Sequence, residues 1–208
     1  MSVPWRLVRH QDRRSQGLSL PGGDRVLSGR NRGWLGLHHE ARRSSMMGLP
    51  TLEQMQFQHA AAQLNALHAE LIDDDRLEEW PDLFEEKCQY SVISAENHNR
   101  SLNLAAVFCD SRGMLVDRIV SLRRANIFPA HSYRHILGPT RVKSTSGQIV
   151  TTQTNYVVLM TRNDGQTSIY NSGKYVDQID VSGAAPRFLS KTAIFDTHLI
   201  DTMMVRPI

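Results

Sequence analysis

The spacing of hydrophobic residues changes near residue 130, and this change constrains the fold more than any other feature of the chain. Before it, apolar residues recur at steps of three and four, as on one face of a helix. After it, apolar and polar residues alternate, as in half-buried strands. Helices followed by a run of strands predict an α+β fold, with three N-terminal helices packed on one face of a curved, mostly antiparallel sheet.

The first helix is expected from Leu52 onward and ends at the three consecutive acids Asp73–Asp75. We interpret these acids as a solvated turn and cap, because short acidic side chains favour turns. Asp75 followed by Glu78 resembles a capping box and predicts a second, short helix that Trp80 and Pro81 interrupt. The expected apolar stripe of the first helix consists of Phe57, Ala60, Leu64, Leu67 and Leu71.

A third helix is expected after a loop that contains Asn97, His98 and Asn99, with Asp110 or Ser111 as its N-cap. The apolar stripe of this helix is predicted to be Leu115, Ile119 and Leu122. Strands are predicted at residues 89–94, 133–143, 148–162, 167–181 and 187–199. The last four are separated by short turns rich in Gly, Asn, Asp and Ser, so they are expected to be antiparallel neighbours.

The first 48 residues differ from the rest in charge and in pattern. They hold nine Arg, no Lys and three acids, a net charge of +6, whereas residues 49–208 hold 15 basic and 18 acidic residues, a net charge of −3. No hydrophobic periodicity there exceeds one turn. We therefore expect residues 1–48 to be a disordered Arg/Gly-rich extension, or the product of a start assigned too early, and residues 49–208 to be a single α+β domain.

The remaining composition is that of an ordinary globular protein, with 40% hydrophobic and 22% charged residues. No apolar run approaches the roughly 18 residues of a membrane span, so no membrane partner is expected. Cys88 and Cys109 stand in no metal-binding motif, and two reduced core thiols are the expected state in a cytoplasmic protein.

Motifs that carry chemistry are missing from the sequence. It contains no GxGxxG after a strand, no phosphate-binding GxxxxGK[ST] and no nucleophile-elbow GxSxG. His131 and His135 could pair on a helix, but at the entry to a strand their side chains would lie about 13 Å apart, too far to share a metal ion. The expectation is therefore a chain with no catalytic, cofactor-binding or metal-binding residues of its own.

Arginines gather around the third helix and the strand after it, at positions 118, 123, 124 and 134. They are either a solvated face or a surface that pairs with acids of a partner, since Arg suits ion pairs between subunits. We take the second interpretation as the working hypothesis. The candidate interface residues are Arg118, Arg123, Arg134 and His135.

Several stretches from Leu52 to Ile208 resemble the small (beta) subunits of bacterial Rieske-type aromatic-ring-hydroxylating dioxygenases. LIDDDRLEEW at 71–80 resembles the opening motif E-x-x-L-L-D-x-x-x-x-x-x-W of that family, and MLVDRI at 114–119 resembles its third helix. YRHILG at 133–138 is most similar to the terephthalate branch, and less closely to the anthranilate and halobenzoate branches. Two departures are Ser132, where many members have Arg, and Gly138-Pro139 in place of Ser-Asn.

The resemblance implies a nuclear-transport-factor-2-like cone and a structural role. In such enzymes the large subunit carries a Rieske two-iron two-sulfur cluster and a mononuclear iron, and electrons come from NADH through a reductase or ferredoxin. The small subunits are expected to form a trimer within a three-plus-three hexamer. The holoenzyme would dihydroxylate an aromatic carboxylate such as terephthalate or anthranilate.

Two other functions stay open from the sequence. The same cone can host a free-standing isomerase, dehydratase or hydrolase, which here would use an acid/base pair such as Asp110 and His135 in a deep pocket. The Arg-rich first segment could instead bind nucleic acid, although the acidic remainder of the chain argues against such a partner.

Overall fold

The computed structural model describes residues 49–102, 104–125, 130–197, 204 and 206–208. All of them belong to one of the two compact units into which the chain divides, Met46–Ile208. The predictions for residues 1–48 lie outside the described residues and stay predictions.

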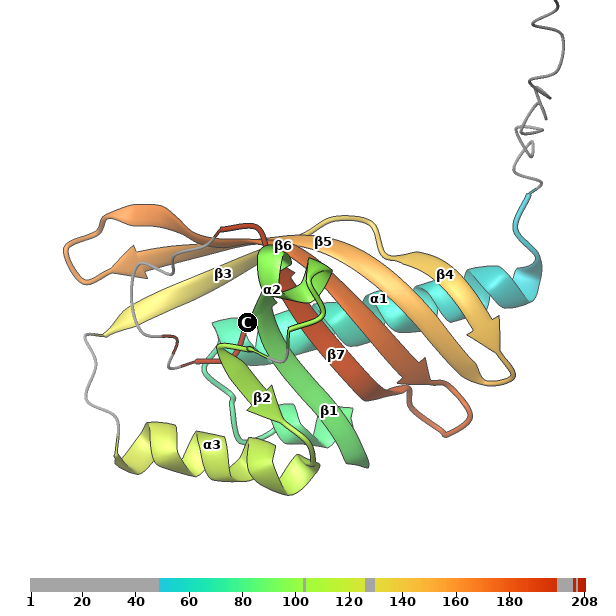
Figure 1. Cartoon of the computed structure of the whole chain (residues 1–208), viewed down its shortest axis with the longest axis horizontal. Helices are drawn as coiled ribbons and strands as arrows, with labels where there is room; N and C mark the ends of the chain where they lie inside the picture. The colour runs from blue at the N-terminus through green and yellow to red at the C-terminus, as the bar shows by residue number, and fades with distance from the viewer. Residues whose placement is uncertain (1–48, 103, 126–129, 198–203, 205) are drawn as a thin grey trace, which may run out of the picture. The chain divides into compact units, whose positions relative to one another are not determined.

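A seven-stranded curved sheet forms the body of this unit (Figure 1). Its order is β2-β1-β7-β6-β5-β3, with β4 also paired to β5. All neighbours are antiparallel except β1 and β7, which run parallel. The strands are β1 (Phe84–Ser94), β2 (Val107–Cys109), β3 (His131–Leu137), β4 (Arg141–Ser146), β5 (Ile149–Arg162), β6 (Thr167–Asp180) and β7 (Arg187–Phe195).

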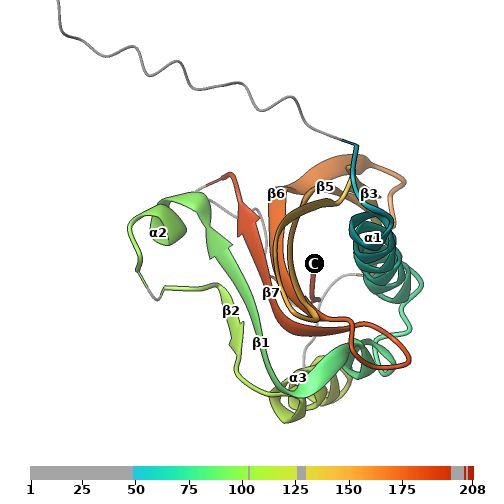
Figure 2. The same cartoon turned by 90° about the vertical axis from the view of Figure 1, so that its right-hand side faces the viewer.

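The two longer helices pack against different parts of the sheet. Helix α1 (Leu52–Asp73) lies along the concave face of the sheet (Figure 2), while α3 (Arg112–Arg124) packs beside β1 and β2. Thr51 and Gln54 form a capping box at the start of α1, and Ser111 caps α3 as predicted. The buried stripe of α3 is the predicted set Leu115, Ile119 and Leu122. The predicted α+β architecture is therefore confirmed.

Two local predictions between the helices were wrong. No second α-helix follows the acidic turn, because Asp75 takes a left-handed backbone conformation (φ 60°) and Pro81 allows only the short 3-10 helix η1 (Trp80–Leu83). The expected loop around Asn97 instead contains the one-turn helix α2 (Ala95–Asn99), which the Ser94 hydroxyl caps.

The strand predicted at residues 133–143 is two strands. Residues His131–Leu137 and Arg141–Ser146 pair with different parts of the long strand β5, separated by a break at Gly138 and Pro139. The break matches the proline, which cannot donate a ladder hydrogen bond. Two of the short turns predicted between the last four strands are confirmed at Gly147 and Gly165, and both glycines have positive φ.

The buried face of α1 is rotated from the predicted stripe. Leu64 and Leu71 are buried, but Leu67 is 39% exposed. In its place Asn65 and His68 face the interior. Polar side chains thus enter the core from α1, which hydrophobic periodicity alone could not predict.

Candidate subunit interface and buried polar interior

The turn after α1 organises the region that contains the predicted interface residues. At the end of the helix the Asp74 backbone N–H donates to the Glu70 carbonyl oxygen at 2.9 Å, and the Asp75 backbone N–H donates to the Ile72 carbonyl oxygen at 3.3 Å. The sequence analysis predicted that all three acids are solvated, but this is wrong for Asp73, because only 4% of its side chain is exposed. The turn therefore places two carboxylates next to neighbouring elements. The carboxylate of Asp73 is buried, and that of Asp75 is partly exposed.

His135 is buried against the first of these carboxylates. The Asp73 carboxylate accepts a hydrogen bond from the His135 backbone N–H at 2.8 Å and lies 2.6 Å from its ring Nδ1. The neighbouring Arg134 has 68% of its side chain exposed and lies 3.8 Å from the same carboxylate. Of this pair only Arg134 can reach a partner directly, while His135 ties β3 to the end of α1.

Arg123 joins α3 to the same turn. Its guanidinium donates to the Glu78 carboxylate at 2.8 and 3.1 Å, to the Asp75 carboxylate at 2.9 Å and to the Asp75 carbonyl at 2.8 Å. The hydrogen bond from Arg123 lowers the pKa of Glu78. Arg123 is thus engaged within the chain and closes the gap between α3 and the acidic turn.

Replacing Arg123 by Ala should lower the free energy of unfolding by about 1 kcal/mol. Four hydrogen bonds to a carboxylate pair and a carbonyl would be lost, but the partly exposed site is screened by solvent. Urea unfolding measures the change, and the loss should shrink at high salt. Arg124→Ala is the matched control on the same helix, expected to change stability by less than about 0.5 kcal/mol. Equal losses in the two variants would contradict this role.

Two arginine contacts fix the last described residues, Met204 and 206–208, against the rest of the domain. The Arg118 Nη2 donates to the Met204 carbonyl at 2.9 Å, and Arg206 lies 3.4 Å from the Asp75 carboxylate. Three of the four candidates therefore contact the acidic turn at the end of α1, Arg123 through Asp75 and both Arg134 and His135 through Asp73, whereas Arg118 is bonded to Met204.

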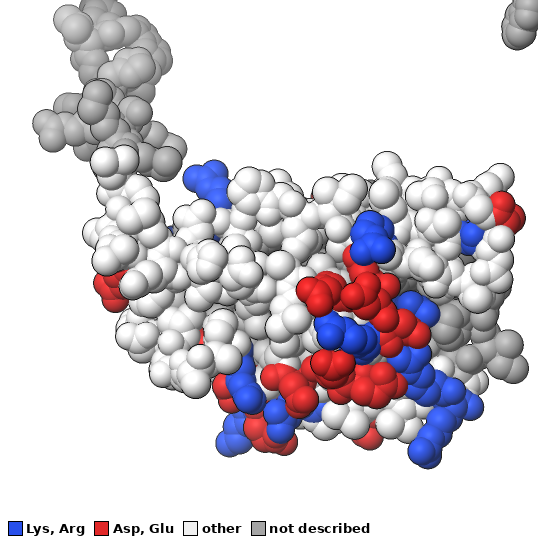
Figure 3. All heavy atoms as spheres, turned by 180° about the vertical axis from the view of Figure 1, so that it is seen from behind, with Lys and Arg blue, Asp and Glu red and all other residues white. Residues whose placement is uncertain are grey.

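Charged side chains gather on this part of the surface. Figure 3 shows the face that carries α1, where acidic and basic residues cluster toward the C-terminal end of the helix and its N-terminal half is mostly uncharged. Ion pairs such as Arg76 with Glu70 at 2.7 Å and Arg112 with Glu86 at 3.1 Å lie within the chain. Because both signs alternate there, the cluster is not a uniform basic footprint.

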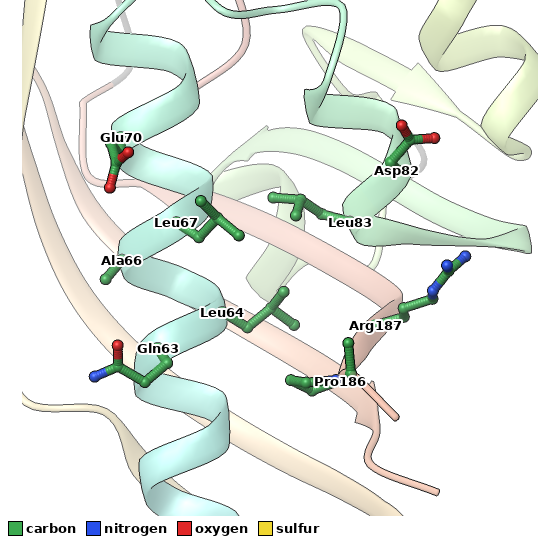
Figure 4. A pocket seen from close by; sticks show the side chains of 10 residues that line it. Gln63, Leu64, Ala66, Leu67, Glu70, Asp82, Leu83, Pro186 and Arg187 are labelled. Atoms are coloured by element: carbon green, nitrogen blue, oxygen red, sulfur yellow. The ribbon is translucent and has the colours of Figure 1, made fainter. Parts of the chain in front are cut away.

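A groove of about 410 Å³ opens beside this cluster, between α1, η1 and the start of β7 (Figure 4). Leu64, Leu67 and Leu83 give it an apolar floor, and Glu70, Asp82 and Arg187 contribute charged side chains. The described residues that line it include no Ser, Cys or His beside these charged side chains.

The pair suggested for a free-standing enzyme is not assembled. Asp110 is exposed at the start of α3, whereas the His135 side chain is buried against Asp73. Neither residue lines the groove of Figure 4. The geometry therefore gives no support to acid/base chemistry by these two residues.

A buried polar cluster that the sequence analysis missed lies between α1, β6 and β7. The Lys191 ammonium donates to the Asn65 amide oxygen at 2.6 Å and lies 3.4 Å from both oxygens of Asp177, while the Asn65 amide nitrogen donates to Asp177 at 3.0 Å. The ammonium also lies 3.7 Å from the centre of the Tyr175 ring. All four residues are fully buried. Burial lowers the pKa of Lys191 to about 8 and raises that of Asp177, against their mutual attraction.

His68 is a second polar residue inside the cone. Its ring packs against Trp80, Tyr175 and Phe188 at 5.8 to 6.0 Å, and neither ring nitrogen has a hydrogen-bond partner among the described residues. Burial, with a smaller contribution from Lys191, holds the pKa of His68 well below 6.5. His68 is therefore a neutral packing residue at pH 7.

Acidification from pH 6.5 should cost stability through His68. Its pKa is lower in the folded than in the unfolded chain, so the unfolded chain binds the extra proton and is favoured as the pH falls below 6.5. The slope from this group approaches about 1.4 kcal/mol per pH unit. His68→Leu should flatten the pH dependence of the unfolding free energy between about pH 6.5 and 5, measured by urea unfolding. An unchanged slope would exclude this contribution, whatever the absolute stability of the variant.

The described residues contain no group of three or more His, Cys, Asp and Glu side chains that could hold a metal ion. Cys88 and Cys109 are free and buried, and burial raises the pKa of Cys88 to about 11. None of the helices in the described part of the chain combines the length and apolar character that crossing a membrane requires.

Comparison with known proteins identifies the relatives of this chain. The family described as "Ring hydroxylating beta subunit" matches residues 67–202. The small subunit of anthranilate 1,2-dioxygenase from Burkholderia cepacia is 38% identical over 137 residues, 66% of this chain and 85% of the relative. A beta subunit of the terminal oxygenase component of terephthalate 1,2-dioxygenase from Comamonas is 37% identical over 147 residues, 71% of this chain and 96% of the relative.

A solved structure extends the agreement to the fold. It is a protein assigned as the beta subunit of an aromatic-ring-hydroxylating dioxygenase from Novosphingobium aromaticivorans. It is 45% identical, has a TM-score of 0.69, and the match covers 76% of this chain and all of that one. The predicted cone and the predicted resemblance are confirmed. This chain belongs to the beta-subunit family of the aromatic-ring-hydroxylating dioxygenases, and is a part of an oxygenase rather than a catalyst by itself.

Proposed function

We propose that this chain is the structural small subunit of a multicomponent dioxygenase that dihydroxylates an aromatic carboxylate in cytoplasmic aromatic catabolism. The observation that carries the substrate class is the identity of 36–38% to the small subunits of anthranilate and terephthalate dioxygenases, since both names denote aromatic carboxylates. Residues 49–208 would be the working domain.

In this proposal the redox groups belong to the large subunit. That partner would carry a Rieske two-iron two-sulfur cluster and a mononuclear iron, and a reductase or ferredoxin would supply electrons from NADH. The chemistry of this chain's own side chains supports the division, because His135 is engaged by Asp73 and the two cysteines are buried with raised pKa values. Three copies of this chain would join three large subunits in a hexamer.

Arg134 is the candidate that best suits contact with a partner subunit. It is exposed on the edge strand β3 and pairs across the sheet with Leu159, which in turn pairs with Ile169 on β6. Ile169 is 70% exposed, and Ile136, two residues after Arg134, is also exposed. An exposed apolar patch beside a cation fits an interface with an apolar centre and an acidic rim on the partner.

The proposed function is tested by co-expressing this chain with the large subunit encoded next to it in the genome, followed by size-exclusion chromatography and iron analysis. We expect a colourless chain alone and a brown, iron-containing hetero-hexamer in the complex. Stoichiometric iron bound by this chain alone, or no association with a large subunit, would contradict the proposal.

The interface is tested separately by reversing one charge. Arg134→Glu should weaken the complex at least tenfold, because a carboxylate would replace the cation at the rim of the patch. Lys143→Glu, at an exposed position of β4, is the matched control and should leave the complex intact. If both variants associate like the unmodified chain, Arg134 is not part of the interface.

A further inference from the structure

Two exposed surfaces of this chain have complementary chemistry. The first, which we call the outer patch, crosses three neighbouring strands. Arg134 and Ile136 of β3 pair with Leu159 and Val157 of β5, and Leu159 pairs in turn with Ile169 of β6. Ile136 and Ile169 are exposed, and Val157 and Leu159 are half-buried between them. The outer patch is therefore an apolar surface with one exposed cation, Arg134, beside it.

The second surface is the groove of Figure 4, which has an apolar floor of Leu64, Leu67 and Leu83 and a volume of about 410 Å³. Its surroundings carry an excess of negative charge. Among the described residues, the ion pairs around the groove join five carboxylates to three guanidinium groups. These pairs are Arg76 with Glu70 and Glu79, Arg112 with Asp82 and Glu86, and Arg187 with Glu85. The groove therefore suits an apolar side chain that has a cation next to it.

Asp82 is the carboxylate at the rim of the groove that is most open to a new cation. Its side chain is 78% exposed, and Arg112 lies 3.8 Å from it but only 3.1 Å from Glu86. Glu70, by contrast, is held by Arg76 at 2.7 Å. A cation from another molecule can thus pair with Asp82 without breaking a short contact.

The two surfaces lie on opposite faces of the sheet. The ring of His135 contacts Asp73 at the end of α1, so alternation along β3 places the Cβ atoms of Arg134 and Ile136 on the face away from α1. The groove lies on the side of α1, which lines it and covers the concave face (Figure 2). A contact between two such different surfaces is heterologous, because each copy offers one surface to a second copy and the other surface to a third.

We propose that the outer patch of one copy docks in the groove of a second copy of this chain, with Ile169 against the apolar floor and Arg134 beside Asp82. Heterologous contacts close into a ring when the rotation between copies permits. The number of copies in the ring, three, rests on the proposed function, in which three copies join three large subunits. The contact itself is carried by the chemistry of the two surfaces.

A charge swap within one chain tests the pairing of Arg134 with Asp82, and sedimentation equilibrium of the full chain measures the association of copies. Arg134→Glu and Asp82→Lys should each weaken the association at least tenfold, because each places like charges across the contact. Arg134→Glu/Asp82→Lys should restore the association to within about threefold of the unmodified chain, because opposite charges again meet at every contact. Glu53→Lys, an exposed position in the first turn of α1, is the matched control and should change nothing.

A second pair of variants tests the apolar half of the contact. Ile169→Ser should weaken the association about tenfold, because the isoleucine would be buried between copies. Leu104→Ser is the matched control, expected to leave the association unchanged. Both side chains are largely exposed in the single chain, at 70% and 65%, so neither variant should alter folding.

Rescue by the charge swap separates a second copy from any other occupant of the groove, since a different partner would not carry the compensating charge. An unmodified chain that stays monomeric at about 0.1 mM would overturn the inference, because a contact of standard size is occupied at that concentration. A double variant no stronger than the weaker single variant would overturn it as well. A chain that forms a trimer but joins no large subunit would contradict the proposed function and support this contact.

Discussion

Lys191→Met should lower the free energy of unfolding by about 3–5 kcal/mol, because it leaves the Asp177 carboxylate buried without its cation. Both side chains have no exposed surface, and the ammonium lies 3.4 Å from both carboxylate oxygens. Without it, the Asn65 amide at 3.0 Å is the remaining hydrogen-bond donor to Asp177 among the described contacts. One neutral donor cannot compensate the desolvation of a charge.

A double-mutant cycle separates the pair from its parts. Asp177→Leu should cost a similar amount, but Lys191→Met/Asp177→Leu should recover more than half of either loss, since no unpaired charge remains. Urea unfolding of the four proteins at pH 7 gives the free energies. Additive losses would mean that the two groups do not interact, in contradiction of the geometry.

The cluster of Asp177, Lys191 and Asn65 also shows which contacts could not be predicted from the sequence. Alternation in the predicted strand at residues 167–181 places Asp177 on the same face as Tyr175 and Ile179, so its inward position was available as a signal. A lone Asp on an apolar face has no partner in its own strand. Its cation, 14 residues later, and its amide, on α1, are brought together only by the packed fold.

The candidate interface residues show the same limit. Their types suggested ion pairs, and Arg123 does form them, but with Asp75 and Glu78 of its own chain, 48 and 45 residues away. Charge alone does not distinguish a bond within the chain from one to a partner. The exposed fraction of each side chain does, and it leaves Arg134 as the candidate that best suits a partner.

The elements themselves were predictable wherever pattern and turn chemistry agreed. The long strands β5 and β6, the turns at Gly147 and Gly165, and the stripe of α3 follow from alternation, positive φ and capping. Prediction failed at the acidic turn, where the left-handed conformation of Asp75 redirects the chain. It also failed in α1, where Asn65 and His68 are buried although the predicted apolar stripe does not include them.

Gly173→Ala should lower the free energy of unfolding by about 3 kcal/mol, the second large effect expected in this fold. A Cβ at this position in β6 would lie 2.1 Å from the Ile194 carbonyl oxygen and 2.9 Å from the Phe195 Cα. Both atoms are backbone of the paired strand β7, so the sheet itself must shift. A single glycine inside a strand pattern is typical of such close backbone approach.

Gly113→Ala is the matched control, because beyond its chain neighbours and the backbone of its own helix the same added methyl group meets no described atom within 4 Å. Gly113 lies in the first turn of α3, where alanine is the better helix former, so this change should stabilise the protein by about 0.5–1 kcal/mol. If the same substitution changes the free energy of unfolding in opposite directions at the two positions, the loss at Gly173 comes from the clash with β7. It would not be a general effect of replacing glycine by alanine. Thermal and urea unfolding of the two variants measure both signs, and a neutral Gly173→Ala would mean that β6 and β7 can separate at this point without cost.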